Sequence, residues 1–113
     1  MERLRQYEIW WAELPKPAGK RPVLLLTRDS AYSYLDKFMV AEITSTIRDI
    51  AVEVRLGPSE GLSSPCVANC DSLRMVAKTS LAKRVGALDR ARSIEVKRAL
   101  GAALGWRELT DLD

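Results

Sequence analysis

The chain has 113 residues, of which 47% are hydrophobic and 29% charged, a balance typical of an ordinary globular domain rather than of a disordered or fibrous chain. The 18 Lys and Arg residues outnumber the 15 Asp and Glu residues, and this net charge of +3 either favours a polyanionic partner or simply solubilises the surface. Because so short a chain has little room for a deep cavity, we expect one domain over residues 1–113 whose site is shallow or shared between subunits.

Missing residue types exclude several enzyme classes. The chain has no histidine and only 2 cysteines, Cys66 and Cys70, so Cys and His alone cannot form a four-ligand zinc site, and the usual histidine-paired nucleophiles are unavailable. There is no glycine-rich phosphate loop and no acidic cluster for magnesium. We therefore expect no metal and no cofactor, and we interpret both cysteines as buried structural residues.

Targeting and membrane signals are also missing from the sequence. No apolar run approaches the ~20 residues that a membrane span requires, and the opening MERLRQYEIWW lacks the apolar segment of a signal peptide. We expect a cytoplasmic protein without a membrane partner, in which the cysteines stay reduced.

The first half of the chain predicts four short strands separated by turn signals. An aromatic and aliphatic run ends at Pro15, and the irregular basic loop Pro15–Lys20 follows it. A compact apolar run then predicts a buried strand, and later aliphatic residues at every second position predict a half-buried one. The predicted strands cover Gln6–Leu14, Arg21–Thr27, Phe38–Ile47 and Ile50–Leu56.

After a turn-rich connection, the sequence predicts two further strands, Cys66–Asp71 and Leu73–Ala77. With a period of two residues, Cys66 and Cys70 lie on one face of the first of these strands. Asn69 and Asp71 then share the other face, where they can point together at solvent or at a ligand.

The end of the chain predicts a helix. From Asp89 onward, apolar residues recur at helical spacing, with Asp89 able to cap the start and Gly105 able to close the end. Short strands followed by one terminal helix predict a mainly β (α+β) fold, a small, strongly bent barrel of six or seven antiparallel strands with the helix packed on it.

Short polar residues gather at the predicted strand ends. Arg21 follows the basic loop, Thr44, Ser45 and Thr46 end the third strand, and Asn69 lies near Asp71. Arginine binds phosphate in a bidentate manner and hydroxyl groups can hold the remaining oxygens, so these residues are a plausible site for a phosphodiester. The alternatives are a solvated arginine, threonines chosen for β-propensity and a turn aspartate. We interpret Trp10, Trp11 and Trp106 as core or interface residues rather than platforms for base stacking.

The order of several short motifs resembles the MazF/PemK/Kid family of toxins from type II toxin–antitoxin systems. The motifs are, in chain order, EIWWAEL, RPVLLLTRD, VAEITS, SPCVANCDSLRMVAKTSL and KRVGALD, followed by a helix ending in LGW. The resemblance covers almost the whole chain. Its most specific parts are Arg-Pro before an aliphatic strand, Ile-Thr-Ser at the next strand end, and the later pair Asp71 and Arg74.

The resemblance implies an SH3-like barrel with a helix, and a homodimer whose two subunits form a groove for single-stranded RNA. It further implies an mRNA interferase, that is, a metal-independent, sequence-selective endoribonuclease toxin. We expect the RNA's own 2'-hydroxyl to attack, giving 2',3'-cyclic phosphate and 5'-hydroxyl ends. The expected partner is a cognate antitoxin with an acidic, partly disordered segment that covers the same groove.

The family also implies functional residues. Its catalytic arginine and threonine fall on Arg21 and Thr44, and Ser45 and Asp71 match further positions implicated in some members. These four residues are the predicted catalytic set. The predicted RNA-binding residues are Lys20, Arg28, Arg48, Asn69 and Arg74.

The sequence departs from the family pattern at several positions. The loop before Arg21 is shorter than usual, and Tyr7 stands where a glycine is typical. Glu42 replaces the usual proline or alanine just before Ile-Thr-Ser. Asn69 replaces an arginine that one branch of the family uses as a proton donor, and because an amide cannot do acid chemistry, we do not expect that branch's mechanism here as a whole.

Two rival functions are compatible with the same fold. A non-catalytic poison that resembles CcdB and binds DNA gyrase would use the C-terminal helix end, where Trp106 could be an anchor residue. A plain SH3-like interaction module would have neither activity.

Overall fold

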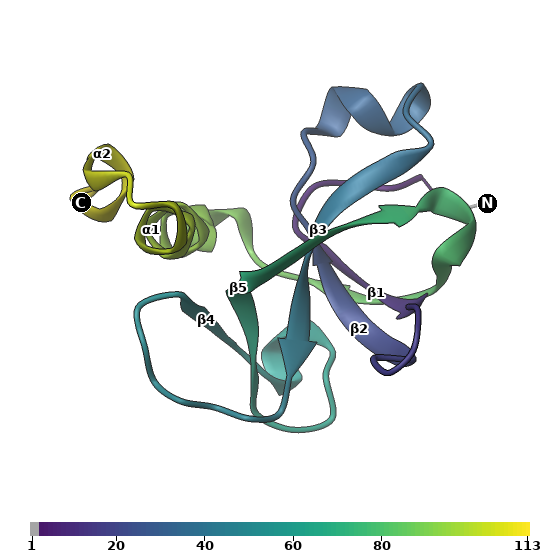
Figure 1. Ribbon diagram of the computed structural model, residues 1–113, viewed down its shortest axis with the longest axis horizontal. Coiled ribbons are helices and arrows are strands. Elements are labelled where there is room, and N and C mark those ends of the chain that lie inside the picture. Colours follow the sequence, from purple (N-terminus) through teal and green to yellow (C-terminus); the bar gives the residue numbers. More distant parts are fainter. Residues whose placement is uncertain (1–2) are drawn as a thin grey trace.

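The computed structural model describes residues 3–113. One strongly curled antiparallel sheet of six strands forms a half-barrel, and the helix α1 (Ser93–Leu104) packs against β4 and β5 (Figure 1). This arrangement confirms the predicted fold class, a mainly β structure with a C-terminal helix. The strands lie in the order β4-β5-β3-β2-β1-β6. Their bounds are β1 Glu8–Glu13, β2 Lys20–Leu25, β3 Lys37–Thr44, β4 Glu53–Leu56, β5 Cys66–Ala77 and β6 Leu81–Ala87.

The first three strands agree with the predicted ranges to within a few residues, whereas β4 is shorter than predicted. Residues 50–52 belong to the turn before β4, which begins at Glu53. Asp49 adopts a φ of 58°, and the Glu53 carboxylate accepts the backbone N–H groups of Arg48 at 3.1 Å and Asp49 at 2.8 Å. Those hydrogen bonds stabilise a turn instead of a strand, and Ile50 is left 46% exposed.

β5 is one long strand rather than the two short strands predicted. Its pairing with β3 shifts in register, because Ala41 lies opposite Leu73 while the next residue, Glu42, lies opposite Asn69. Residues 70–72 therefore bulge out of the ladder. Such a bulge bends the strand and increases the twist of the sheet, which suits a half-barrel.

β6 is a strand that the sequence analysis missed. It pairs with β1 at the edge of the sheet. Its sequence, with Lys83 and Arg84 in the middle, has neither alternating apolar residues nor a continuous apolar run. An edge strand with exposed basic residues carries little hydrophobic signal.

The two faces of the sheet cover two apolar clusters. On one face, large side chains of β1, β2 and β3 pack around Phe38, Val23 and Trp10. On the other, Ile9, Leu24 and the predicted inward face of β5 pack against helix α1; the contacting residues are Cys66, Ala68, Cys70, Val96 and Ala99. Both cysteines are buried, as predicted.

The predicted helix begins later than expected. The Asp89 side chain accepts the N–H of Ala91 at 2.9 Å and caps a short 3₁₀ turn, Arg90–Arg92, from which α1 continues. Gly105 closes α1 with a φ of 76°, as predicted from its freedom in the left-handed region. A single helical turn, α2 (Arg107–Thr110), follows and packs on α1. In the described residues 3–113, no helix is long and apolar enough to cross a membrane.

Tyr7 occupies an unusual backbone conformation for an aromatic residue. Its φ is 73°, in the left-handed region where glycine is favoured. The ring is buried, with the Arg90 guanidinium 5.5 Å from its centroid, and the backbone N–H donates to Leu25 O at 2.8 Å. Burial of the ring and these contacts offset the cost of the conformation.

The 3₁₀ turn after β4, η2 (Pro58–Glu60), meets the edge strand β6 through a close contact between glycines. A Cβ on Gly86 would lie 2.0 Å from the carbonyl oxygen of Glu60, and a Cβ on Gly61 would lie 2.4 Å from that of Val85. Only glycine permits this approach. It brings the segment after β4 to the opposite edge of the curled sheet and fixes residues 61–64.

We expect Gly86→Ala to destabilise the fold by about 3 kcal/mol, because the new methyl group would collide with backbone atoms that cannot rotate away. For a chain of this size, that corresponds to a fall of roughly 10 °C in melting temperature. Gly57→Ala is the matched control, since its Cβ would meet nothing closer than 3.7 Å. Equal melting temperatures for the two variants, measured by circular dichroism, would contradict the close contact.

Candidate active site

A pocket opens at the end of the sheet where β2 begins and β3 ends. Its volume is about 500 Å³. The walls come from the start of β2 with Trp11 of β1 beside it, the end of β3, and the loop of residues 61–64 that leads to β5. The lining residues are Trp11, Lys20, Arg21, Pro22, Ile43, Thr44, Ser45, Gly61, Leu62, Ser63, Ser64 and Cys66.

The register of β2 and β3 explains why Arg21 and Thr44 meet. Val23 lies opposite Glu42 in this antiparallel pair. Two residues further along, the same register places Arg21 across from Thr44 on the same face, because side chains alternate between the two faces of a sheet. The structure thus brings together three members of the predicted catalytic set, Arg21, Thr44 and Ser45, in one pocket.

The polar groups of this pocket remain accessible. The Arg21 side chain is 36% exposed. The hydroxyl oxygen of Thr44 accepts the backbone N–H of Thr46 at 3.2 Å, which leaves its hydrogen for another acceptor. The Lys20 ammonium lies 5.7 Å from the centre of the Trp11 ring, so that a second cation stands at the pocket wall.

One carboxylate lies between two arginines beside the pocket. Oε1 of Glu42 is 3.7 Å from a guanidinium nitrogen of Arg21, and Oε2 accepts a hydrogen bond from Nε of Arg74 at 2.8 Å. Arg74 does not line the pocket itself, but this ion pair holds it next to the residues that do.

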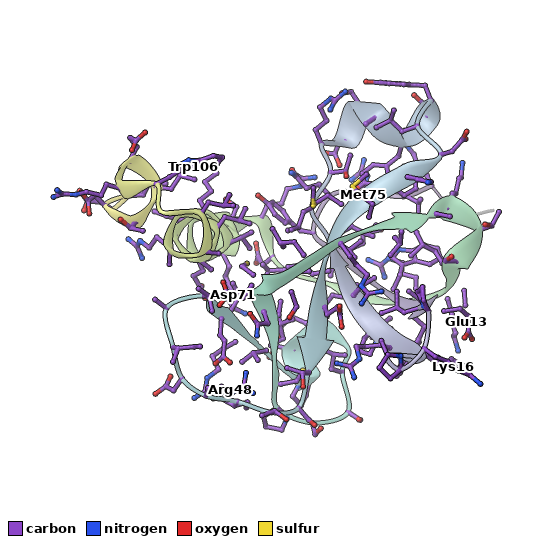
Figure 2. All side chains as sticks on the ribbon, viewed as in Figure 1. Glu13, Lys16, Arg48, Asp71, Met75 and Trp106 are labelled. Carbon is purple, nitrogen blue, oxygen red and sulfur yellow. The ribbon has the colours of Figure 1, made fainter. Side chains whose placement is uncertain are left out.

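Asn69 and Asp71 do not join the pocket. Asn69 is buried, and its side-chain oxygen accepts the backbone N–H of Asp71 at 2.8 Å, which stabilises the bulge in β5. Asp71 lies in that bulge and is exposed (Figure 2). The two residues are therefore linked to each other, but they do not lie together on an open face.

The remaining RNA-binding candidates lie elsewhere. Arg28 lies over the Tyr34 ring, 5.9 Å from its centre, and donates a hydrogen bond to the Tyr34 hydroxyl. Arg48 is exposed on the β3–β4 loop (Figure 2). Of the five predicted RNA-binding residues, only Lys20 lines the pocket.

Sequence reasoning missed part of this site. Leu62, Ser63 and Ser64 reach the pocket only because the glycine contact folds their loop toward β6. Glu42 was visible in the sequence only as a departure from a family pattern. Trp11 is half-buried at the pocket wall, whereas Trp10 is in the core and Trp106 is 52% exposed.

Burial disfavours the thiolate form of both cysteines. Burial raises the pKa of Cys70 to about 11, with the neighbouring Asp71 carboxylate adding to the effect. Burial, followed by the charge of Glu60, likewise raises the pKa of Cys66, which touches the pocket. Because the thiolate is the nucleophilic form of cysteine, burial makes both thiols poor nucleophiles.

The arrangement suits a phosphate group bound at the pocket mouth. A guanidinium offers paired N–H donors to two phosphate oxygens, and a hydroxyl group on the adjacent strand can donate to a third. The apolar walls provided by Trp11, Pro22 and Leu62 offer room for a flat group attached to that phosphate. A ligand that combines phosphates with planar rings fits this combination.

Comparisons with known proteins identify the family. Residues 5–104 match the family described as PemK-like, MazF-like toxin of type II toxin-antitoxin system. The chain is 38% identical over 98 residues to a probable endoribonuclease MazF5 of Mycobacterium tuberculosis, covering 86% of this chain and 89% of that protein. It is also 34% identical over 103 residues to a probable endoribonuclease MazF2 of the same species, covering 90% of this chain and 99% of the relative.

Solved structures agree with this assignment. The Mycobacterium tuberculosis toxin MazF-mt6 superimposes with a TM-score of 0.81 at 33% identity, covering 87% of this chain and 96% of the other. An endoribonuclease from a mycobacterial species, solved in complex with its cognate antitoxin, has a TM-score of 0.78 and covers 90% and 95% of the two chains; at 24% identity it shows the shared fold alone. The chain belongs to the PemK-like, MazF-like family of toxins of type II toxin–antitoxin systems.

Proposed function

We propose that this protein is a sequence-selective endoribonuclease toxin that cuts single-stranded RNA without a metal ion. The observation that carries the proposal is that Arg21 and Thr44, on the adjacent strands β2 and β3, line one open pocket. Relatives named endoribonucleases match nearly the whole chain, which supports the same reaction class here.

In the proposed reaction the RNA supplies its own nucleophile. The 2'-oxygen attacks the adjacent phosphorus, the bond from phosphorus to the 5'-oxygen breaks, and the 2'-hydroxyl proton leaves while the 5'-oxygen gains one. The products are a 2',3'-cyclic phosphate and a 5'-hydroxyl. Because the attack is intramolecular, holding the 2'-oxygen in line with the breaking bond supplies much of the acceleration.

Arg21 and Thr44 have separate roles in this reaction. The Arg21 guanidinium binds the non-bridging phosphate oxygens and stabilises the charge that increases on them in the transition state. Thr44 donates its hydroxyl hydrogen to the same group and fixes its orientation. Ser45, one residue beyond on the pocket wall, offers a second hydroxyl to the neighbouring sugar or phosphate.

The small size of the pocket supports two protein partners, a second copy of the chain and an antitoxin. One subunit presents a cleft of only about 500 Å³, so a stretch of several nucleotides requires a longer groove, which a homodimer would form. A cognate antitoxin would occupy the same groove with an acidic, partly disordered segment, placing carboxylates where the RNA places phosphates.

A direct test is incubation of the protein with naked single-stranded RNA in a chelating buffer. Discrete fragments are expected, because the proposed chemistry needs no metal. The alternative of a gyrase poison rests on the exposed Trp106 beside α2 (Figure 2). Intact RNA together with inhibited supercoiling by gyrase would replace the nuclease proposal with that alternative.

We expect Thr44→Val to slow RNA cleavage at saturating RNA by at least about tenfold, the effect of losing one oriented hydrogen bond to the reacting phosphate. The side chain keeps its shape, and the released Thr46 N–H can bind water because Thr46 is exposed. Thr27→Val is the matched control, since the Thr27 hydroxyl also accepts a backbone N–H, that of Met39, but lies outside the pocket. Equal slowing in both variants would show that the effect is structural.

A further inference from the structure

We infer that Glu42 is a positioning residue for RNA cleavage: its carboxylate, anchored by Arg74, holds the Arg21 guanidinium at the pocket mouth while leaving its donors available to a phosphate. This inference rests on the proposed function and assigns a role to a residue that touches no substrate. Three adjacent strands provide the triad, with Arg21 on β2, Glu42 on β3 and Arg74 on β5.

The sheet register brings these three side chains together. Glu42 lies opposite Val23 on β2, and its neighbour Val40 lies opposite Arg74 on β5. Arg21 and Arg74 are therefore diagonal neighbours of Glu42 on the same face, at the distance where long side chains of opposite charge interact. The Glu42 side chain is 15% exposed, less than Arg21 at 36% and Arg74 at 31%, so the carboxylate lies beneath the two cations.

The two arginines contact Glu42 differently. Arg74 makes a hydrogen bond of 2.8 Å, whereas Arg21 lies 3.7 Å away, beyond hydrogen-bonding distance. Within residues 3–113, the side-chain contact of the Arg21 guanidinium is this ion pair at 3.7 Å and no hydrogen bond. Charge attraction thus restrains the Arg21 guanidinium without using the N–H groups that a phosphate would accept.

Arg74 keeps this arrangement open. A lone carboxylate beside an arginine favours a bidentate pair, which would use two of the arginine's donors. Because Oε2 of Glu42 already accepts a hydrogen bond from Arg74, the N–H donors of Arg21 stay available to a phosphate. The two arginines and one carboxylate together carry a net charge of +1. Arg74 therefore acts on the reaction through Glu42, from outside the pocket.

A negative charge beside an RNA site opposes RNA binding, and this gives the inference a distinctive signature. If Glu42 only stabilised the fold, its replacement would leave the rate of the folded protein unchanged. If it only repelled RNA, its replacement would improve both binding and cleavage. If it positions Arg21, its replacement improves or preserves binding while slowing the chemical step, because a misplaced guanidinium stabilises the transition state less well.

The experiment measures single-turnover cleavage of a short RNA, and the affinity for the same RNA with a 2'-deoxy nucleotide at the cut site, for Glu42→Gln. The glutamine keeps the size and can still accept the Arg74 hydrogen bond, so the variant should fold. Expected results are a cleavage rate lowered by about tenfold and an affinity that is equal or up to a few times higher. Glu108→Gln removes the same charge from the exposed helix α2, and we expect it to cut at the parental rate.

Arg74→Ala tests the same triad by removing the partner that anchors Glu42, and it replaces Glu42→Gln if that variant does not fold. Losing Arg74 lets Glu42 close on Arg21, so cleavage should again slow by about tenfold or more. In the Glu42→Gln background, Arg74→Ala should add much less, because the carboxylate that it controls is gone. Fully multiplicative effects of the two changes would overturn the inference.

Other outcomes also decide the matter. A parental rate in folded Glu42→Gln overturns the positioning role while leaving the nuclease proposal intact. A cleavage rate lowered by more than about a thousandfold, together with loss of the fall in rate at low pH, would make Glu42 the proton acceptor and overturn the positioning role. If the parental protein cuts no RNA, the proposed function itself fails, and that result is read from the parental reaction alone.

Discussion

Arg21→Ala is expected to slow RNA cleavage by roughly a hundredfold or more, while RNA affinity falls far less. The change removes the guanidinium that lines the pocket together with Thr44. Losing a preorganised charge partner for a transition-state oxyanion typically costs on the order of 3 kcal/mol, which corresponds to this factor in rate. The rate is measured at saturating RNA, and the affinity with an RNA that carries a 2'-deoxy nucleotide at the cut site.

The variant should remain folded. Arg21 is 36% exposed and lies 3.7 Å from the Glu42 carboxylate, too far for a hydrogen bond, and such a solvent-screened ion pair contributes at most about 1 kcal/mol to stability. Glu42 keeps its hydrogen bond to Arg74, so no buried charge is orphaned. Arg107→Ala, on the exposed helix α2, is the charge-matched control. Parental cleavage by a folded Arg21→Ala protein would remove Arg21 from the catalytic pair.

Replacing one nucleotide of the RNA by its 2'-deoxy form at the cut site is expected to abolish cleavage there. In the proposed reaction the 2'-oxygen is the nucleophile, because the chain has no histidine to activate the hydroxyl groups of the pocket and burial raises the pKa of the Cys66 thiol. The residual rate should be more than about a thousandfold lower, since an intermolecular attack lacks the advantage of a tethered nucleophile. Cleavage is followed on labelled RNA by gel electrophoresis.

The control for this experiment is the same RNA with the deoxy nucleotide moved three or more positions away from the cut site. It should be cut at nearly the parental rate, because only the nucleotide that supplies the 2'-oxygen takes part in bond making. Equal cleavage of the two RNAs would indicate attack by water or by a protein group, and would reject the 2'-hydroxyl mechanism.

Strands and helices that bury one apolar face could be predicted from the sequence. The runs that became β1, β2 and β3 have strong apolar signals, and α1 presents a helical stripe that contains Val96 and Ala99. β6 was missed because its basic residues at the sheet edge gain little from burial. The bulge in β5 was read as a break, since local alternation cannot show whether a strand resumes on the same ladder.

The site could be predicted only where the chemistry lies on neighbouring strands with simple register. An antiparallel pairing of β2 and β3 brings the start of β2 near the end of β3, so the motifs already indicated that Arg21 and Thr44 would line one site. The contact between Glu42 and Arg74 joins residues 32 positions apart in the chain. It depends on the register of β3 against β5, which the bulge in β5 shifts. Nothing in the local pattern predicts such a contact.

The serine-containing wall of the pocket has a similar origin. Residues 61–64 read as an ordinary turn, and they approach Trp11 and Arg21 because Gly61 and Gly86 permit a contact that any side chain would block. A close approach of two backbone segments depends on the tertiary structure. In the sequence it leaves only two glycines, with nothing to indicate that they come into contact.

Analysis of the RNA ends tests the central claim most directly. A long single-stranded RNA is cut in chelating buffer, and its fragments are assayed before and after phosphorylation of their 5' ends and opening of cyclic phosphates. The expected fragments carry 5'-hydroxyl and 2',3'-cyclic phosphate ends, and a parallel Arg21→Ala preparation yields at least about a hundredfold fewer of them. Fragments with 5'-phosphate and 3'-hydroxyl ends, or equal amounts from both preparations, would contradict cleavage by RNA's own 2'-hydroxyl at the Arg21 and Thr44 pocket.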